Sequence, residues 1–192
     1  GGTNEAEGVF RMIKNRRKSE GAAALKEAAQ AARHLGALAF LNDTAKALRA
    51  YREAVDLDPD DAEGWNRLGL LLMRIGDLRD AETAYRKVLA LGNASADKAA
   101  IAAAHGNLGL IAQTRGDLDS AEKFHRKALA LEEEVGRKEG MANAYGNLGL
   151  IARTRGELDN AEDFLRKALA LHEELGRKEG MANAYGNLGL IA

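Results

Sequence analysis

Apolar residues return at helical spacing along most of the chain. In segment 142–152 they recur every three or four positions, and in segment 158–171 they form one broad face of a helix. Gly156 stands between the two segments and Gly176 follows the second one; glycine commonly ends helices because it tolerates positive φ. This pattern predicts helical hairpins, and short connections make neighbouring helices run antiparallel.

The hairpin pattern is repeated at a fixed period. One seven-residue sequence occurs three times at equal intervals, at 106–112, 146–152 and 186–192. The longer segment 136–152 recurs unchanged at 176–192. A period of about 40 residues indicates stacked supersecondary units, because one unit alone is too small to bury its apolar face. The sequence therefore predicts an array of hairpins.

The first units differ in length from the later ones. The step from Ala47 to Ala81 is shorter than the two equal steps that follow, from Ala81 to Ala121 and from Ala121 to Ala161. In the first unit, Gly36 also stands one residue closer to Ala47 than the pattern requires. We expect a tightened turn between the two helices of that unit.

These steps divide the chain into two parts. Residues 1–19 are interpreted as a tag or a basic helical segment, and residues 20–192 as the array. We expect repeat units at about 20–60, 61–94, 95–136 and 137–176, with a half repeat at 177–192. A basic run near the N-terminus could contact acidic lipid or nucleic acid, but it is interpreted as a solvated helix end; it comprises Arg11, Lys14, Arg16, Arg17 and Lys18.

Composition narrows the functional classes. The formal net charge is −1, so no global field recruits nucleic acid or an anionic membrane. No segment approaches the ~20 apolar residues that a membrane span needs. The chain has no cysteine, which excludes disulfides and thiolate chemistry. We expect a cytoplasmic protein that binds neither nucleic acid nor membrane.

The unit in segment 62–93 resembles the tetratricopeptide repeat, whose pattern is Trp-x2-Leu-Gly-x2-Tyr followed by Gly, Ala, Tyr, Ala and Pro. The matching positions are Trp65, Leu68, Gly69, Gly76, Ala81 and Tyr85. The unit departs from the pattern at Leu72, Val88 and Asn93. The later units are similar to the 40-residue variety of spindle-orientation adaptors and related bacterial proteins, which is marked by Ala-Tyr-Gly-Asn-Leu-Gly.

This resemblance implies an all-α, right-handed superhelical solenoid of hairpins that holds an extended peptide in its concave groove. The glycines and alanines that repeat between units should lie where antiparallel helices cross, because small residues let the backbones approach. These positions are Gly69, Gly109, Gly149, Ala81, Ala121 and Ala161. The leucines at 68, 108 and 148 should fill the space between hairpins.

Asparagines are the strongest candidates for contacts with a partner. Helical projection places one asparagine just before each buried leucine, at the groove edge, and two more asparagines one turn earlier. A carboxamide offers a donor and an acceptor together, so it can satisfy both polar groups of an extended backbone. Nearby arginines could bind a carboxylate. The predicted groove residues are Asn107, Asn143, Asn147, Asn183, Asn187, Gln113, Arg153 and Arg74. As an alternative, the asparagines cap or bridge helices within the array.

No pattern indicates catalysis, a cofactor or a metal. The glycine pairs lie inside a helix, without the strand and lysine of a phosphate loop. The four histidines, His34, His105, His125 and His172, are scattered without the spacing of zinc ligands, and His105 and His125 are interpreted as packing or rim residues. The run Glu132, Glu133 and Glu134 is interpreted as a solvated helix face.

We therefore expect a non-enzymatic scaffold that binds a protein or peptide. Two alternatives stay open: a sensor or targeting arm of a larger signalling protein or enzyme, and a self-assembling architectural module. The half repeat at 177–192 lacks a partner helix in the sequence, which predicts that the natural protein continues or that this end pairs with another copy. Leu188 and Ile191 would then be partly uncovered.

Overall fold

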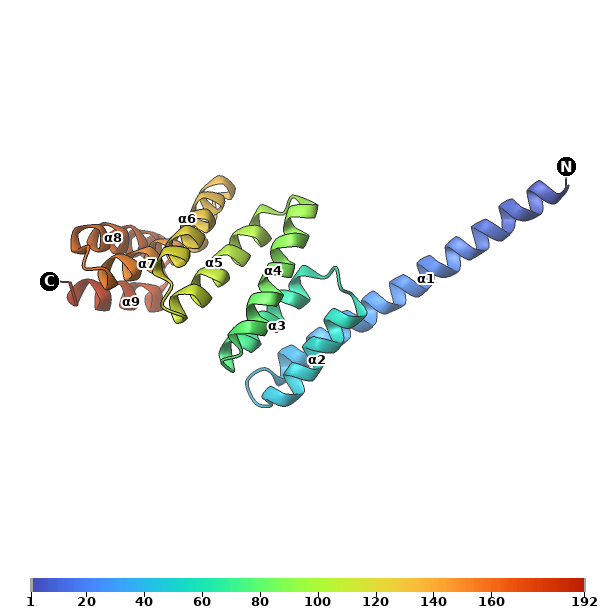
Figure 1. Cartoon of the computed structure of the whole chain (residues 1–192), viewed down its shortest axis with the longest axis horizontal. Coiled ribbons are helices and arrows are strands. Elements are labelled where there is room, and N and C mark those ends of the chain that lie inside the picture. Colours follow the sequence, from blue (N-terminus) through green and yellow to red (C-terminus); the bar gives the residue numbers. More distant parts are fainter. Residues whose placement is uncertain (1, 192) are drawn as a thin grey trace.

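A computed structural model of the chain describes the backbone of residues 2–191 and the side chains of residues 20–191. Within this part the chain forms helices and no strand, and the helices follow one another as packed hairpins (Figure 1). The helices are α1 Gly2–Ala39, α2 Thr44–Leu57, α3 Ala62–Arg74, α4 Leu78–Ser95, α5 Lys98–Thr114, α6 Leu118–Val135, α7 Lys138–Thr154, α8 Leu158–Glu174 and α9 Lys178–Gly189. The all-α solenoid of hairpins is confirmed.

The first unit differs from the sequence predictions at two points. The helix α1 runs through positions 19 and 20 without a break, so the predicted boundary there is not the end of an element. The predicted tightening of the first turn is wrong. Residues 40–43 join α1 to α2, whereas only residues 75–77 join α3 to α4. The spacing between Gly36 and Ala47 is one residue shorter because α1 ends earlier than the other first helices do, and not because the turn is shorter. The basic run at 11–18 lies outside the described side chains.

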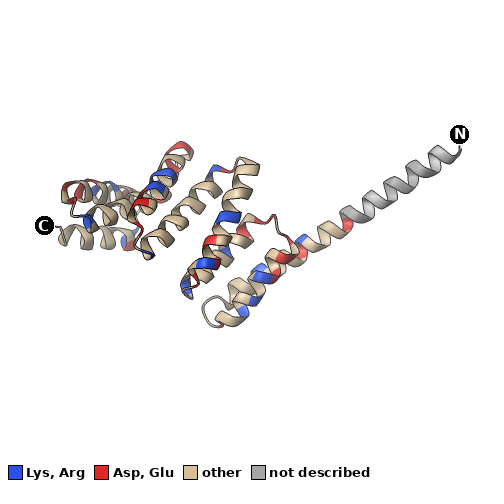
Figure 2. Cartoon of the chain, viewed as in Figure 1, with Lys and Arg blue, Asp and Glu red and all other residues tan. Residues whose placement is uncertain are grey.

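Charges are spread over the described surface. Figure 2 shows lysines and arginines interspersed with aspartates and glutamates along the helices. None of the described helices is long and apolar enough to cross a membrane.

Helix ends are fixed by aspartate caps and glycine turns. The N-cap carboxylates of α2 to α6 accept a hydrogen bond from a backbone N–H two or three residues later; they belong to Asp43, Asp61, Asp77, Asp97 and Asp117. Gly116 and Gly156 have φ of 78° and 77° in the turns inside hairpins, a conformation that side chains disfavour. The N-cap residues of α7, α8 and α9 make no side-chain cap bond.

The missing cap of α8 gives a stability prediction. Glu157 stands at the position that Asp117 occupies one repeat earlier, but its longer side chain makes no cap bond to the backbone. We expect Glu157→Asp to restore the cap and to raise the free energy of unfolding by about 0.5–1 kcal/mol. A melting temperature higher by a few degrees would show the gain, and the reverse exchange Asp117→Glu should lower it. Equal melting temperatures for all three proteins would contradict this role.

Within each hairpin a glycine of the first helix faces a large side chain of the second. A Cβ at Gly69 would lie 2.8 Å from the Tyr85 ring, and a Cβ at Gly109 would lie 2.6 Å from the His125 ring. A Cβ at Gly149 would lie 2.8 Å from Leu165. These contacts confirm the predicted close crossing. The leucines predicted to fill the space between hairpins, Leu68, Leu108 and Leu148, are buried.

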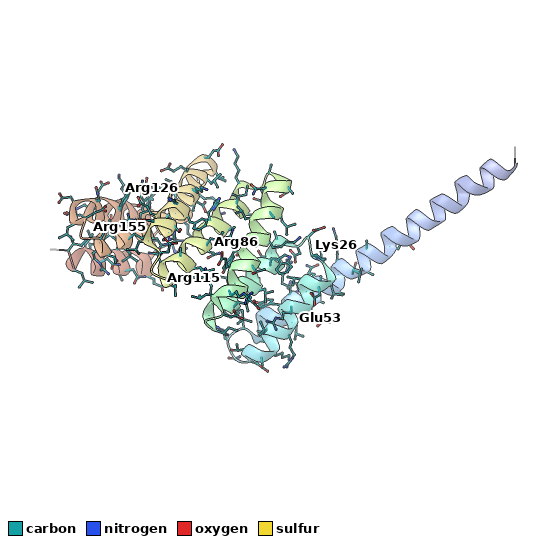
Figure 3. All side chains as sticks on the ribbon, viewed as in Figure 1. Lys26, Glu53, Arg86, Arg115, Arg126 and Arg155 are labelled. Atoms are coloured by element: carbon teal, nitrogen blue, oxygen red, sulfur yellow. The ribbon has the colours of Figure 1, made fainter. Side chains whose placement is uncertain are left out.

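Ion pairs also join consecutive hairpins. Arg115, at the end of α5, donates to Glu82 of α4 at 2.5 Å, and Arg155, at the end of α7, donates to Glu122 of α6. The bond from Arg115 lowers the pKa of the Glu82 carboxyl. The two arginines are labelled in Figure 3 beside Arg86 and Arg126, which lie one turn after these glutamates and pair with them. Each glutamate is therefore bound from its own helix and from the next hairpin.

Candidate functional site

A groove of about 640 Å³ runs along α7, between α5 on one side and α9 on the other. Side chains of α6 and α8, the second helices of the same hairpins, also line the groove. All five predicted asparagines line this groove: Asn107 of α5, Asn143 and Asn147 of α7, and Asn183 and Asn187 of α9. The structure therefore brings together on one surface the asparagines that helical projection selected.

The other three predicted groove residues do not line it. Arg74 donates to Thr44 Oγ1 at 3.1 Å and lies over the Phe40 ring, with its guanidinium carbon 4.1 Å from the centroid. Gln113 hydrogen-bonds to His125 at 3.0 Å, and Arg153 donates to Asn187 Oδ1 at 2.8 Å. These long side chains bend back onto neighbouring helices, which a projection of Cβ directions cannot show.

The asparagines themselves fall into two groups, and the exposed Asn183 belongs with the second one, since its side chain makes no hydrogen bond within the described residues. Asn107 donates to Asn66 Oδ1 at 3.4 Å, and Asn187 both accepts from Arg153 and donates to the carbonyl oxygen of Asn183 at 2.8 Å. Asn107 and Asn187 thus fit the alternative in which asparagines bridge helices. Asn143 and Asn147 make no side-chain hydrogen bond within the described residues; Asn143 is exposed and Asn147 is half-buried. They lie one turn apart on α7, with both carboxamides available.

Asn147 and Asn187 stand at equivalent positions, but the repeats that precede them differ. His125 occupies the position that Leu165 holds in the next repeat, and Gln113 occupies that of Arg153. Gln113 bonds to the His125 imidazole inside its own hairpin, whereas its counterpart Arg153 bonds to Asn187 of the next hairpin. Sequence reasoning found each of these residues but not this coupling. The sequence contained one sign of this coupling: the repeats differ both at 113/153 and at 125/165.

Three buried polar side chains also line the groove. The exposed fractions of His125, Glu132 and His172 are 1%, 4% and 8%, and each has one buried atom without a hydrogen-bond partner in the described structure. Burial raises the pKa of Glu132, and Arg137 partly offsets this effect. Burial lowers the pKa of His125 to about 4 and also lowers that of His172.

The burial of Glu132 corrects the prediction of a solvated helix face. Gly92, Glu132 and His172 occupy equivalent positions in consecutive repeats, and each packs against the first turn of the next hairpin. A Cβ at Gly140 would overlap the Glu132 carboxyl group, so the glycine makes room for it. The repeat period could have revealed this burial, because it aligns Glu132 with Gly92, a small residue at a position that packs against the next hairpin. The prediction that His125 is a packing residue is confirmed by its burial.

Comparison with known proteins identifies the repeats. A model of the tetratricopeptide repeat matches residues 60–134 and 140–192, and a second model, of the TPR repeat, matches residues 37–76. No curated protein sequence matches the chain.

Solved structures share the fold. The crystal structure of MamA protein is 27% identical with a TM-score of 0.64, and the match covers 86% of this chain and 81% of that one. BtubC (BKLC) from P. vanneervenii is 22% identical with a TM-score of 0.70, covering 90% and 82%. Aspartyl phosphate phosphatase F from Bacillus subtilis is 16% identical with a TM-score of 0.79, covering 86% and 45%. The last two, at this identity, show the fold alone.

Proposed function

Because the chain belongs to the tetratricopeptide repeat family, whose repeats generally mediate protein–protein interactions, we propose that it is a non-catalytic scaffold that binds an extended segment of a partner in the groove along α7. The likeness to MamA supports the scaffold role in general terms. The assignment of the later units to the 40-residue adaptor variety stays a prediction, as does the cytoplasmic location.

The availability of the carboxamides of Asn143 and Asn147 carries the proposal. Both line the groove, and neither hydrogen-bonds to a described side chain or backbone group. A helix that exposes two such amides one turn apart offers donors and acceptors from both to a chain lying along it. An extended peptide presents N–H and C=O groups on its edge, so amides recognise it independently of its side chains.

The test is a double substitution, Asn143→Ala with Asn147→Ala. A displayed library of unstructured 12-residue peptides is selected on the full chain, and the affinity of the retained peptides is measured for wild type and variant. Loss of two hydrogen-bonded amides should weaken binding by about 10- to 100-fold, since each bond contributes roughly 0.5–1.5 kcal/mol. The melting temperature should stay equal or rise slightly, because alanine is the better helix former and no internal bond is lost.

Asn93→Ala is the matched control, since Asn93 is exposed on α4 and does not line the groove. It should leave the affinity for the selected peptides unchanged. If the double variant binds the same peptides as tightly as the wild type does, the groove assignment is defeated.

The two alternative roles remain predictions. Leu190 of α9 is 73% exposed and Tyr185 is 54% exposed, while Leu188 and Ile191 are partly uncovered as predicted. These side chains offer an apolar surface for self-association, which light scattering over a concentration series would reveal. A role as the sensor or targeting arm of a larger protein has no structural observation of its own.

A further inference from the structure

Two glycines in the groove have no function in the fold itself. Gly106 lies inside α5 and Gly146 inside α7, neither has positive φ, and a Cβ at either position would meet nothing within 4 Å. The neighbouring helical glycines Gly109 and Gly149, in contrast, give room to His125 and Leu165. Glycine is less favourable than alanine in a helix interior. Gly106 and Gly146 therefore leave the groove open at two points where no packing contact of the fold requires a glycine.

A buried carboxylate provides an independent indication of a ligand. Glu132 lines the same groove, is 4% exposed, and its Oε2 atom has no hydrogen-bond partner in the described structure. The nearest cation is Arg137, whose Nε lies 3.4 Å from Oε2 without hydrogen-bond geometry. A buried acceptor without a donor destabilises the free protein, and a donor supplied by a ligand would remove that cost.

The charges around Glu132 favour a basic donor. The groove is lined by the carboxylates of Glu132, Glu139 and Glu179 and by the guanidinium groups of Arg137 and Arg177. Arg177 is bound to Glu139, which leaves Arg137 as the single cation beside Glu132 among the described groove residues. These groove residues carry three carboxylates and two guanidinium groups, and this excess of negative charge favours the entry of a further cation.

The order of these groups along α7 sets the length of the ligand. Glu132 packs at Gly140, the amides of Asn143 and Asn147 follow, and Leu150 lines the far end of the groove. Ten residues of helix from 140 to 150 span about 15 Å. An extended chain rises about 3.3 Å per residue, so about five residues cover this distance.

We propose that the groove takes an extended segment of about five residues, with a lysine or arginine at the Glu132 end and a large apolar side chain at the end formed by Leu110 and Leu150. The segment lies close to α5 and α7 over Gly106 and Gly146, which brings its backbone within reach of Asn143 and Asn147. This inference rests on the proposed function and adds the chemistry of the partner to it.

Synthetic seven-residue peptide libraries test the basic residue. One library fixes lysine and leucine four positions apart, in both orders, and randomises the rest; a second replaces the lysine with glutamate. The full chain should bind the lysine library at least tenfold more tightly. Glu132→Gln should reduce this preference to less than threefold, while the matched control Glu134→Gln, on the exposed side of the same helix end, should keep it.

Equal binding of the two libraries, or an unchanged preference in Glu132→Gln, would overturn the inference. Other outcomes distinguish a failure of this inference from a failure of the proposed function. If peptides without lysine bind and the Asn143→Ala, Asn147→Ala variant loses them, the groove function stands and the basic preference is wrong. If no library binds better to the wild type than to that variant, the groove function is wrong as well.

Gly146→Ala tests the close approach. We expect it to weaken binding of the lysine library at least tenfold while raising the melting temperature, since a methyl group fills the space of the ligand and favours the helix. Gly186→Ala is the matched control. Gly186 has the same sequence neighbours and open space at Cβ, but it does not line the groove, so binding should not change. Binding of Gly146→Ala at wild-type affinity would overturn the proposed position of the segment.

Discussion

Replacing Tyr85 by alanine is expected to lower the free energy of unfolding by about 3–5 kcal/mol, the cost typical of removing a buried aromatic side chain. Tyr85 of α4 has an exposed fraction of 0%, and its ring fills the space over Gly69 of α3. It belongs to a buried cluster that also contains Leu68, Leu108 and Ile111, so it joins its own hairpin to the next one. Denaturant unfolding followed by circular dichroism would measure the loss.

Tyr85→Phe separates the ring from its hydroxyl group. The Tyr85 hydroxyl is buried without a hydrogen-bond partner among the described residues, and burial raises its pKa. Removing a buried polar group that lacks a partner should be neutral or stabilising. We therefore expect wild-type stability or better for Tyr85→Phe. A loss of less than about 1 kcal/mol in Tyr85→Ala would mean that this ring is not part of the core.

The second large effect is a loss of stability in acid that depends on His125. The pKa of its imidazole is lowered from 6.5 to about 4 by burial in the folded chain. Below pH 6.5 the unfolded chain therefore binds a proton that the folded chain does not bind, and stability falls. The contribution is complete above pH 6.5 and is lost as the pH decreases toward 4. With about 1.36 kcal/mol per pH unit, the total is on the order of 3 kcal/mol.

His125→Leu should remove most of this dependence. Leucine is the natural residue at the equivalent position 165, where it packs on Gly149 as His125 packs on Gly109. The free energy of unfolding would be measured at several pH values between 7 and 4 for wild type, for His125→Leu and for His34→Gln. The last is the control, since His34 is exposed on α1. An equally steep loss in His125→Leu would assign the acid sensitivity to other groups, such as His105 and His172, whose pKa values burial also lowers.

The sequence was sufficient to predict the hairpins because their determinants are periodic and local. Spacing of apolar residues, turn glycines such as Gly156 and small residues such as Gly149 each act within one hairpin, so the repeat period reveals them. The asparagine face followed from the same regularity, since all five asparagines line the groove.

The remaining features depend on contacts between different residues of different helices. The burial of Glu132 requires Gly140 in the next helix, and a single helix gives no sign of it. The directions of Arg74 and Arg153 depend on partners that are distant in the sequence, Thr44 and Asn187. A long side chain can reach several neighbours, so its partner cannot be read from its place on a helical projection.

The pairing of Gln113 with His125 has a consequence for how a duplicated gene segment can diversify. Residues 136–152 and 176–192 are the same sequence, yet Asn147 keeps its amide unoccupied and Asn187 does not. The difference originates in the preceding repeat, where Arg153 bonds to Asn187 but its counterpart Gln113 bonds to the buried His125 of its own hairpin. Two copies with the same sequence can therefore present different surfaces, because substitutions in the preceding repeat change the hydrogen bonds of their side chains.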